Sequence, residues 1–188
     1  WFSFAAENLN NSEATFLKSG KDTFNRYEAI TNNNPFMYSF AERYLEYEEE
    51  ETSVKIGRQI FESFLTKSND TKMIPNTFSG LSINSGFFPD NHLKFAFFNT
   101  QKLRDHQDFH HVLAYNDSNE AYAKYLDNDD SAMHKGLVLS KLQDKGIKDR
   151  LFIVELNNTN IENITINSNF TIVPELISSA MIQGDWNI

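Results

Sequence analysis

Cysteine is absent from the 188 residues of the chain. Its absence excludes disulfide bonds, catalysis by a thiol, and zinc or iron–sulfur sites with cysteine ligands. Glycine and proline are scarce, with seven and four residues. The sequence also lacks a GxxxxGK[ST] phosphate loop, a GxGxxG turn and a GxSxG nucleophile elbow. The common motifs of nucleotide-binding proteins and serine hydrolases are therefore missing.

Basic residues are few, and none of them form a run. The formal net charge is -9 and the pI is about 5.0, which argues against binding to a nucleic-acid backbone. The strongest charge run is the acidic stretch LEYEEEET at 45–52, which is typical of a solvated surface. No apolar run approaches the roughly 18 residues of a membrane helix. We therefore expect no nucleic-acid partner and no membrane span within the chain.

Aromatic residues are abundant, with 17 Phe, seven Tyr and two Trp. Such side chains bury large areas, so most of them are expected in a hydrophobic core. The alternative is an aromatic cavity that binds a ligand, either a small molecule or a protein segment. The candidate ligand-binding residues are Phe87, Phe88, Phe95, Phe97 and Tyr115.

The first third of the chain, residues 1–67, shows spacings typical of helices. The stretch TNNNPF at 31–36 interrupts this pattern. Within it, Asn34 suits a helix N-cap and Pro35 suits the first helical position. Phe36, Phe40 and Tyr44 then follow at i, i+4 and i+8, which indicates a core-facing stripe. With a further helix before this one and another from about residue 53, we expect about three helices. They would pack on the rest of the chain or mediate homodimerisation.

The second half has a different pattern. The polar stretch 66–80, broken by Pro75 and Gly80, is the clearest boundary. LKFAFFNT at 93–100, LFIVEL at 151–156 and the segment 161–173 read as strands, whereas 101–113 and 118–128 read as helices. The predicted fold class is α+β. A single domain, 1–188, would hold a helical subregion, 1–67, packed on a small, mostly antiparallel sheet within 78–188.

A histidine cluster, DHQDFHH at 105–111, is the main candidate for chemistry. On a helix, His106 and His110 would lie one turn apart on one face, which is a known arrangement of two zinc ligands. No third ligand is evident, and HExxH is absent. The alternative is two ordinary histidines at the edge of an apolar face. On a strand, His110 and His111 would instead point to opposite sides.

The strand interpretation carries a resemblance. HHVLAYNDSNEAYAKYL at 110–126 resembles a strand and helix of the RNA 2′-phosphotransferases of the ADP-ribosyltransferase superfamily. LFIVELNN and VPELI are similar to a late strand and a Val-Pro-Pro-Glu-type segment of that family. The resemblance would cover residues 81–184 and implies His111 and Glu175 as the positions to test. The family's early His-Gly-Thr-type motif and its phosphate-gripping basic residues are missing.

The absence of motifs, the acidic surface and the helical first third favour a non-catalytic ligand- or protein-binding module. An extracytoplasmic sensory or interaction domain of a bacterial protein fits these features, and no cofactor is expected. The alternative is an enzyme, with either a histidine-based metal site or a degenerate ADP-ribosyltransferase-like fold.

Overall fold

The computed structural model describes residues 2–7, 36–68, 75–102, 109–112, 143–147 and 150–186. All secondary-structure elements in these ranges are β-strands, in the order β1 to β9. Among these residues, no helix is long and apolar enough to cross a membrane. The strands are β1 (Phe2–Glu7), β2 (Phe36–Glu49), β3 (Thr52–Gln59), β4 (Thr77–Ser85), β5 (Asn91–Lys102), β6 (His110–His111), β7 (Leu151–Ile161), β8 (Ile164–Val173) and β9 (Ile177–Trp186).

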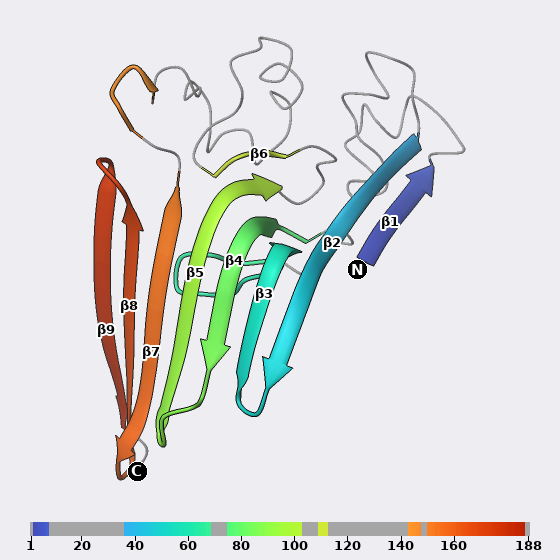
Figure 1. The fold of residues 1–188 in the computed structure, drawn as a ribbon. Coiled ribbons are helices and arrows are strands. Elements are labelled where there is room, and N and C mark those ends of the chain that lie inside the picture. Colours follow the sequence, from blue (N-terminus) through green and yellow to red (C-terminus); the bar gives the residue numbers. More distant parts are fainter. Residues whose placement is uncertain are drawn as a thin grey trace, which may run out of the picture.

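The strands form one curved, antiparallel sheet in which nearly every strand pairs with its neighbours in the chain (Figure 1). The order across the sheet is β1-β2-β3-β4-β5-β7-β8-β9, and the short β6 pairs with the end of β5. This meander brings β5 and β7 side by side although the long stretch 103–150 separates them in sequence. The sheet is therefore an up-and-down arrangement with no crossover among the described strands.

Apart from the short β8–β9 turn at 174–176, the connections alternate in length between the two ends of the sheet (Figure 1). At one end, β2–β3 and β7–β8 are joined by the turns 50–51 and 162–163, and β4–β5 by residues 86–90. A residue in each of these turns has a positive φ: Glu50 at 50°, Asp90 at 59° and Asn163 at 61°. Positive φ is what tight hairpin turns require. At the opposite end, β1–β2, β3–β4 and β5–β7 are joined by much longer stretches of chain.

β8 illustrates why these sequences form strands. In ITINSNFTIV, Ile and Phe alternate with Thr and Asn along most of its length, which is the two-residue period of a strand with one apolar and one polar face. β-branched and aromatic residues also favour the extended backbone. The same alternation recurs in β3, where Val54 and Ile56 are separated by Lys55.

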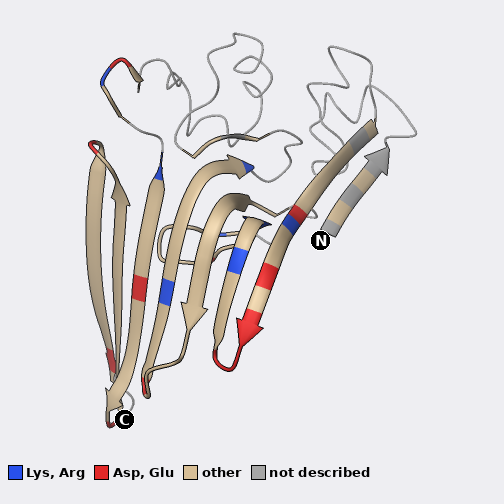
Figure 2. Ribbon diagram, viewed as in Figure 1, with Lys and Arg blue, Asp and Glu red and all other residues tan. Residues whose placement is uncertain are grey.

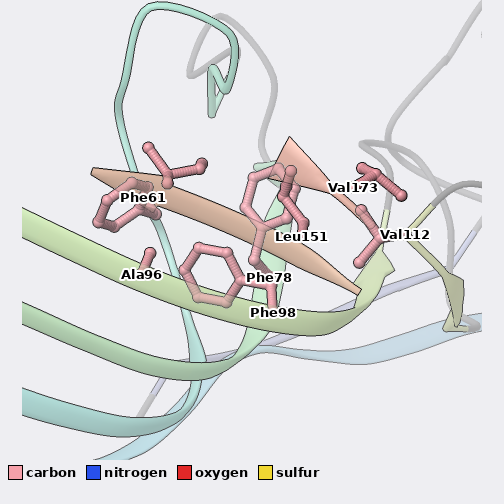
Figure 3. Close-up of a cluster of buried hydrophobic side chains, with 8 residues drawn as sticks. Phe61, Phe78, Ala96, Phe98, Val112, Leu151 and Val173 are labelled. Atoms are coloured by element: carbon pink, nitrogen blue, oxygen red, sulfur yellow. The ribbon is translucent and has the colours of Figure 1, made fainter. Parts of the chain in front are cut away.

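The buried hydrophobic cluster is small and lies toward the end of the sheet with the long connections (Figure 3). Phe98 of β5 is fully buried, and its ring centre lies 5.2 Å from those of Phe61 and Phe78. The cluster does not extend along the sheet, and many large apolar side chains elsewhere are exposed. The cluster consists of Phe61, Phe78, Ala96, Phe98, Val112, Leu151, Ile153 and Val173.

The predicted α+β class is wrong, because the described parts of 1–67 are strands and not helices. The stripe at Phe36, Phe40 and Tyr44 lies on β2, and the helix expected from about residue 53 is β3. A spacing of four residues is a multiple of two, so it also places residues on one side of a strand. The strands expected at 93–100 and 151–156 agree with β5 and β7. The helix expected at 118–128 lies outside the described residues.

Candidate functional site

The candidate site is a whole surface of the sheet. In an antiparallel sheet, residues directly opposite each other on neighbouring strands project to the same side. The register from β2 to β9 therefore assigns the side chains to two faces. We call the face that carries Leu45 the apolar face, and the face that carries Glu46 the polar face.

Two cross-strand rows dominate the apolar face, and they are apolar throughout except for Ser178. Their side chains are exposed or half-buried: Leu45 is 80% exposed and Ile56 is 60% exposed. A contiguous apolar surface of this extent marks contact with a membrane or a partner. In strand order, the rows are Leu45, Ile56, Leu81, Phe97, Phe152, Ile172 and Ser178, and Tyr47, Val54, Ile83, Phe95, Val154, Phe170 and Ala180.

The rows of the polar face carry charged and hydrogen-bonding side chains. Two ion pairs lie across neighbouring strands, with Lys55 Nζ 3.3 Å from Glu46 Oε1 and Lys94 Nζ 3.8 Å from Glu155 Oε2. Such pairs contribute little when solvent reaches them. The rows are Glu46, Lys55, Ser82, Ala96, Ile153, Thr171 and Ser179; Glu48, Ser53, Asn84, Lys94, Glu155, Asn169 and Met181; and His92, Asn157, Asn167 and Gln183.

Amide side chains continue the polar face across β7, β8 and β9. Asn157 Nδ2 donates to Asn167 Oδ1 at 2.6 Å, and Asn167 Nδ2 donates to Asp185 Oδ2 at 3.2 Å. Gln183 Nε2 donates to the same carboxylate at 2.8 Å and 3.1 Å. Because these bonds link side chains on adjacent strands, this part of the face is a connected polar surface.

A segment between β3 and β4, residues 60–68, lies over the polar face. Its Phe61 is 7% exposed and contacts Phe98, whose neighbours Ala96 and Ile153 also project to the polar face. Figure 3 shows Phe61 on this segment beside the side chains of Ala96 and Phe98. The segment therefore covers the upper part of the polar face, while the apolar face opposite stays exposed.

Charged residues are sparse along the middle of the described strands (Figure 2). They concentrate at the turn between β2 and β3, where Glu48 to Glu51 are consecutive. The strands that carry the apolar rows have 8 to 14 residues, and a strand needs about 9–11 residues to cross a bilayer. The strands therefore have about the length that a strand needs to cross a membrane.

The sequence matches a known family over most of its length. Residues 18–133 match the family described as outer membrane porin, OprD family. The chain belongs to the OprD family of outer membrane porins. No curated protein has a sequence that matches this OprD-family chain.

The fold of this OprD-family chain is similar to parts of solved structures. OccD3 (OpdP) from Pseudomonas aeruginosa matches with a TM-score of 0.60 and 12% identity, over 82% of this chain and 32% of that one. OccK8 (OprE) from the same organism matches with a TM-score of 0.58 and 13% identity, over 84% of this chain and 35% of that one. OccAB1 from Acinetobacter baumannii matches with a TM-score of 0.53 and 12% identity, over 76% of this chain and 27% of that one. The chain therefore spans about a third of the length of these structures.

Family membership corrects several predictions made from the sequence. The soluble binding module, the enzyme alternative and the absence of a membrane span are wrong, because the family is one of outer membrane porins. Homodimerisation through helices in 1–67 is also wrong, because the described residues there form strands. The common cause is that apolar side chains were assigned to a core, whereas many of those on the sheet are exposed.

The structure separates the aromatic residues predicted to bind a ligand. Phe87 and Phe88 lie in the β4–β5 turn, exposed and in edge-to-face contact, with ring centres 5.3 Å apart. Phe95 and Phe97 project from the apolar face of β5, and the ring centre of Phe97 lies 4.9 Å from that of Phe152, with the two rings tilted by 41°. Tyr115 lies outside the described residues. Ligand binding by these residues stays a prediction, and the four described phenylalanines do not form one cluster.

The histidine and transferase candidates are also spread out. His110 and His111 form the short β6, as the strand interpretation expects, while His106 lies outside the described residues. Glu175 is exposed in the β8–β9 turn with a φ of 66°. No group of three or more potential metal ligands occurs among the residues that the structure describes. Sequence reasoning missed the polar face itself, although the alternation in ITINSNFTIV could have revealed it.

Proposed function

We propose that this chain forms part of the wall of a water-filled channel across an outer membrane. In this proposal, the apolar face contacts lipid and the polar face lines the channel. The observation that carries it is the pair of apolar rows, which run from Leu45 and Tyr47 across the sheet to β9 with no charged residue. Outer-membrane barrels alternate in this way, with apolar residues outside and polar residues inside.

The connections support an orientation. Outer-membrane barrels have short turns on the periplasmic side and long loops on the outside. The turns 50–51, 86–90 and 162–163 would therefore face the periplasm, and the segment 60–68 would enter the channel from the outer side. The acidic turn at Glu50 and Glu51 would then lie in water beyond the lipid.

The polar face suggests small polar solutes as the cargo. Both described lysines of this face, Lys55 and Lys94, are paired with glutamates, and amides dominate β7 to β9. Such a wall offers hydrogen bonds with little net charge. A barrel needs about 16–18 strands to hold an aqueous channel, so the described sheet would be one arc of it. The segment 60–68 would narrow the channel from one side.

The test is conductance of the full-length protein in planar lipid bilayers. Stepwise increases in current are expected when the folded protein inserts. Uptake of small uncharged polar solutes by vesicles that contain the protein would confirm a water-filled passage. Folded, membrane-inserted protein that carries no current and admits no solute would contradict the proposal.

A further inference from the structure

We propose that Glu155 of β7 is the positioning residue that holds the segment 60–68 across the channel and so sets its open width. This inference rests on the proposed function, because it concerns the segment that narrows the channel. Its support is a set of contacts that converge on one carboxylate from two strands of the wall and from the segment itself.

The Glu155 carboxylate joins the segment to the sheet. Its Oε1 accepts hydrogen bonds from the backbone N–H of Phe64 and from Asn169 Nδ2, both at 2.9 Å. Its Oε2 lies 3.8 Å from Lys94 Nζ, and the Glu155 side chain is only 14% exposed. Hydrogen bonds to an ionised acceptor are stronger than hydrogen bonds between neutral groups. The bond from the Phe64 N–H to the Glu155 carboxylate therefore attaches the segment firmly to β7.

Lys94 adds a second attachment to the segment. Its Nζ donates to the backbone carbonyl of Glu62 at 3.4 Å while it faces Glu155. Each member of the ion pair therefore contacts the backbone of the segment, one through an acceptor and one through a donor. The other ion pair of the polar face, between Glu46 and Lys55, joins β2 to β3.

The segment is ordered internally, so its anchors hold it as a unit. Ser63 and Thr66 bond to each other through their hydroxyl groups at 2.7 Å and through backbone N–H and carbonyl at 2.9 Å. The Glu62 carboxylate accepts from the backbone N–H of Ser68 at 2.9 Å. Phe61 fixes one end of the segment in the buried cluster. Glu155 fixes the middle, where the chain crosses the polar face.

Loss of this acceptor has a definite consequence. In the Glu155→Ala variant, the Phe64 N–H and the Lys94 ammonium lose their carboxylate partner, and water that takes its place leaves the Phe64 N–H without a direct bond to β7. The segment then lifts from the polar face while Phe61 keeps its end attached. We expect a larger and noisier single-channel conductance.

The first experiment compares single-channel conductance of the full-length wild-type protein with that of Glu155→Ala and Glu162→Ala. Glu162 is an exposed acid in the β7–β8 turn, remote from the segment, so its loss serves as the matched control. An increase in conductance in Glu155→Ala alone supports the proposal. Equal conductance in all three proteins overturns it.

The second experiment uses the absence of native cysteine. Ser63 is 5% exposed, so a Ser63→Cys variant reports when the segment opens to a thiol reagent. Adding Glu155→Ala is expected to raise the labelling rate about tenfold or more. Adding Glu155→Gln retains an acceptor oxygen and is expected to raise it less. A labelling rate that Glu155→Ala leaves unchanged would contradict the proposal.

The two proposals fail in different ways. Folded wild-type protein without conductance contradicts the channel, while the labelling rates in that folded protein still test the Glu155 anchor. Wild-type protein that conducts, with Glu155→Ala unchanged in both conductance and labelling, contradicts the anchor and leaves the channel standing.

Discussion

Gly57 of β3 lies directly opposite Gly80 of β4, and both have positive φ values, 126° and 157°. The β4–β5 register shifts between Ser79 and Gly80, beside this pair. Glycines and bulges of this kind let a sheet bend.

Replacing the first of these glycines should cost stability. In Gly57→Ala, the added Cβ would lie 2.5 Å from the Arg43 carbonyl oxygen and 2.8 Å from Tyr44 Cα, on a backbone that strongly disfavours side chains. We expect the free energy of unfolding to fall by about 1–3 kcal/mol, as measured by urea denaturation in lipid vesicles. Gly184→Ala is the control, because a Cβ there meets no atom within 4 Å. Equal loss in both variants would contradict this explanation.

The assignment of the two faces can be tested with adjacent residues. Ala180 lies on the apolar face and Ser179 on the polar face of β9. A lysine that faces lipid near the bilayer centre costs about 2–4 kcal/mol, so Ala180→Lys should destabilise the folded protein in vesicles by that amount. Ser179→Lys should change stability little, because its charge reaches water. If Ala180→Lys were tolerated and Ser179→Lys lost stability, the assignment of the two faces would be the wrong way round.

Phe97 and Phe98 lie on opposite faces of β5, so replacing each by alanine should cost a different amount of unfolding free energy. Phe98 is fully buried between Phe61 and Phe78, so Phe98→Ala should cost about 3–5 kcal/mol of unfolding free energy. Phe97 projects from the apolar face and loses mainly its contact with Phe152, which is worth about 0.5–1.5 kcal/mol. Parallel denaturation in vesicles measures both values. A cost for Phe97→Ala equal to that for Phe98→Ala would show that both rings are in the core.

Order in the segment 60–68 should depend on pH through Glu62. Partial burial raises the pKa of Glu62, but hydrogen bonds from the Ser68 side chain and backbone and the charge of Lys67 together hold it below the ordinary value. A lowered pKa means that the stabilisation is present above the ordinary pKa of a glutamate and is lost as the pH falls through the lowered value.

The thiol labelling rate of the Ser63→Cys variant, divided by that of a free thiol at the same pH to correct for loss of thiolate, should therefore rise at acidic pH. The Glu62→Gln change in the same background should remove most of this dependence on pH, since the amide does not titrate. A profile unchanged by Glu62→Gln would assign the effect to another group.

The sequence predicted some strands well and missed the architecture. LFIVEL and LKFAFFNT are short, apolar and rich in β-forming residues, so β7 and β5 were evident from composition alone. In β2, the apolar side chains at Phe36, Phe40 and Tyr44 fit a helix and a strand equally, and the helix was the wrong choice. That residues 1–188 form a single domain stays a prediction.

The candidate site was not predictable by a search for motifs, because the wall of the proposed channel would carry none. The signal for the site is the alternation of polar and apolar side chains along each strand. In β2, Tyr47 lies between Glu46 and Glu48, and in β3, Lys55 lies between Val54 and Ile56. The polar residues form a site only because the strand register places Lys94 of β5 beside Glu155 of β7. The register between strands that are distant in the chain cannot be read from one sequence. The anchor at Glu155 joins residues 91 positions apart in the chain.

The two faces also explain how far such sequences can diverge. A position that meets lipid needs only to be apolar, so Val, Ile, Leu and Phe can replace one another there with little penalty. Backbone hydrogen bonds between strands hold the sheet whatever the side chains are. Evolution can therefore rewrite nearly every residue of the outer face while the strands stay in place. A shared fold at 12–13% identity is the outcome expected if, as proposed, the apolar face contacts lipid, because its side chains are then selected for solubility in lipid and not for fit to a neighbouring side chain.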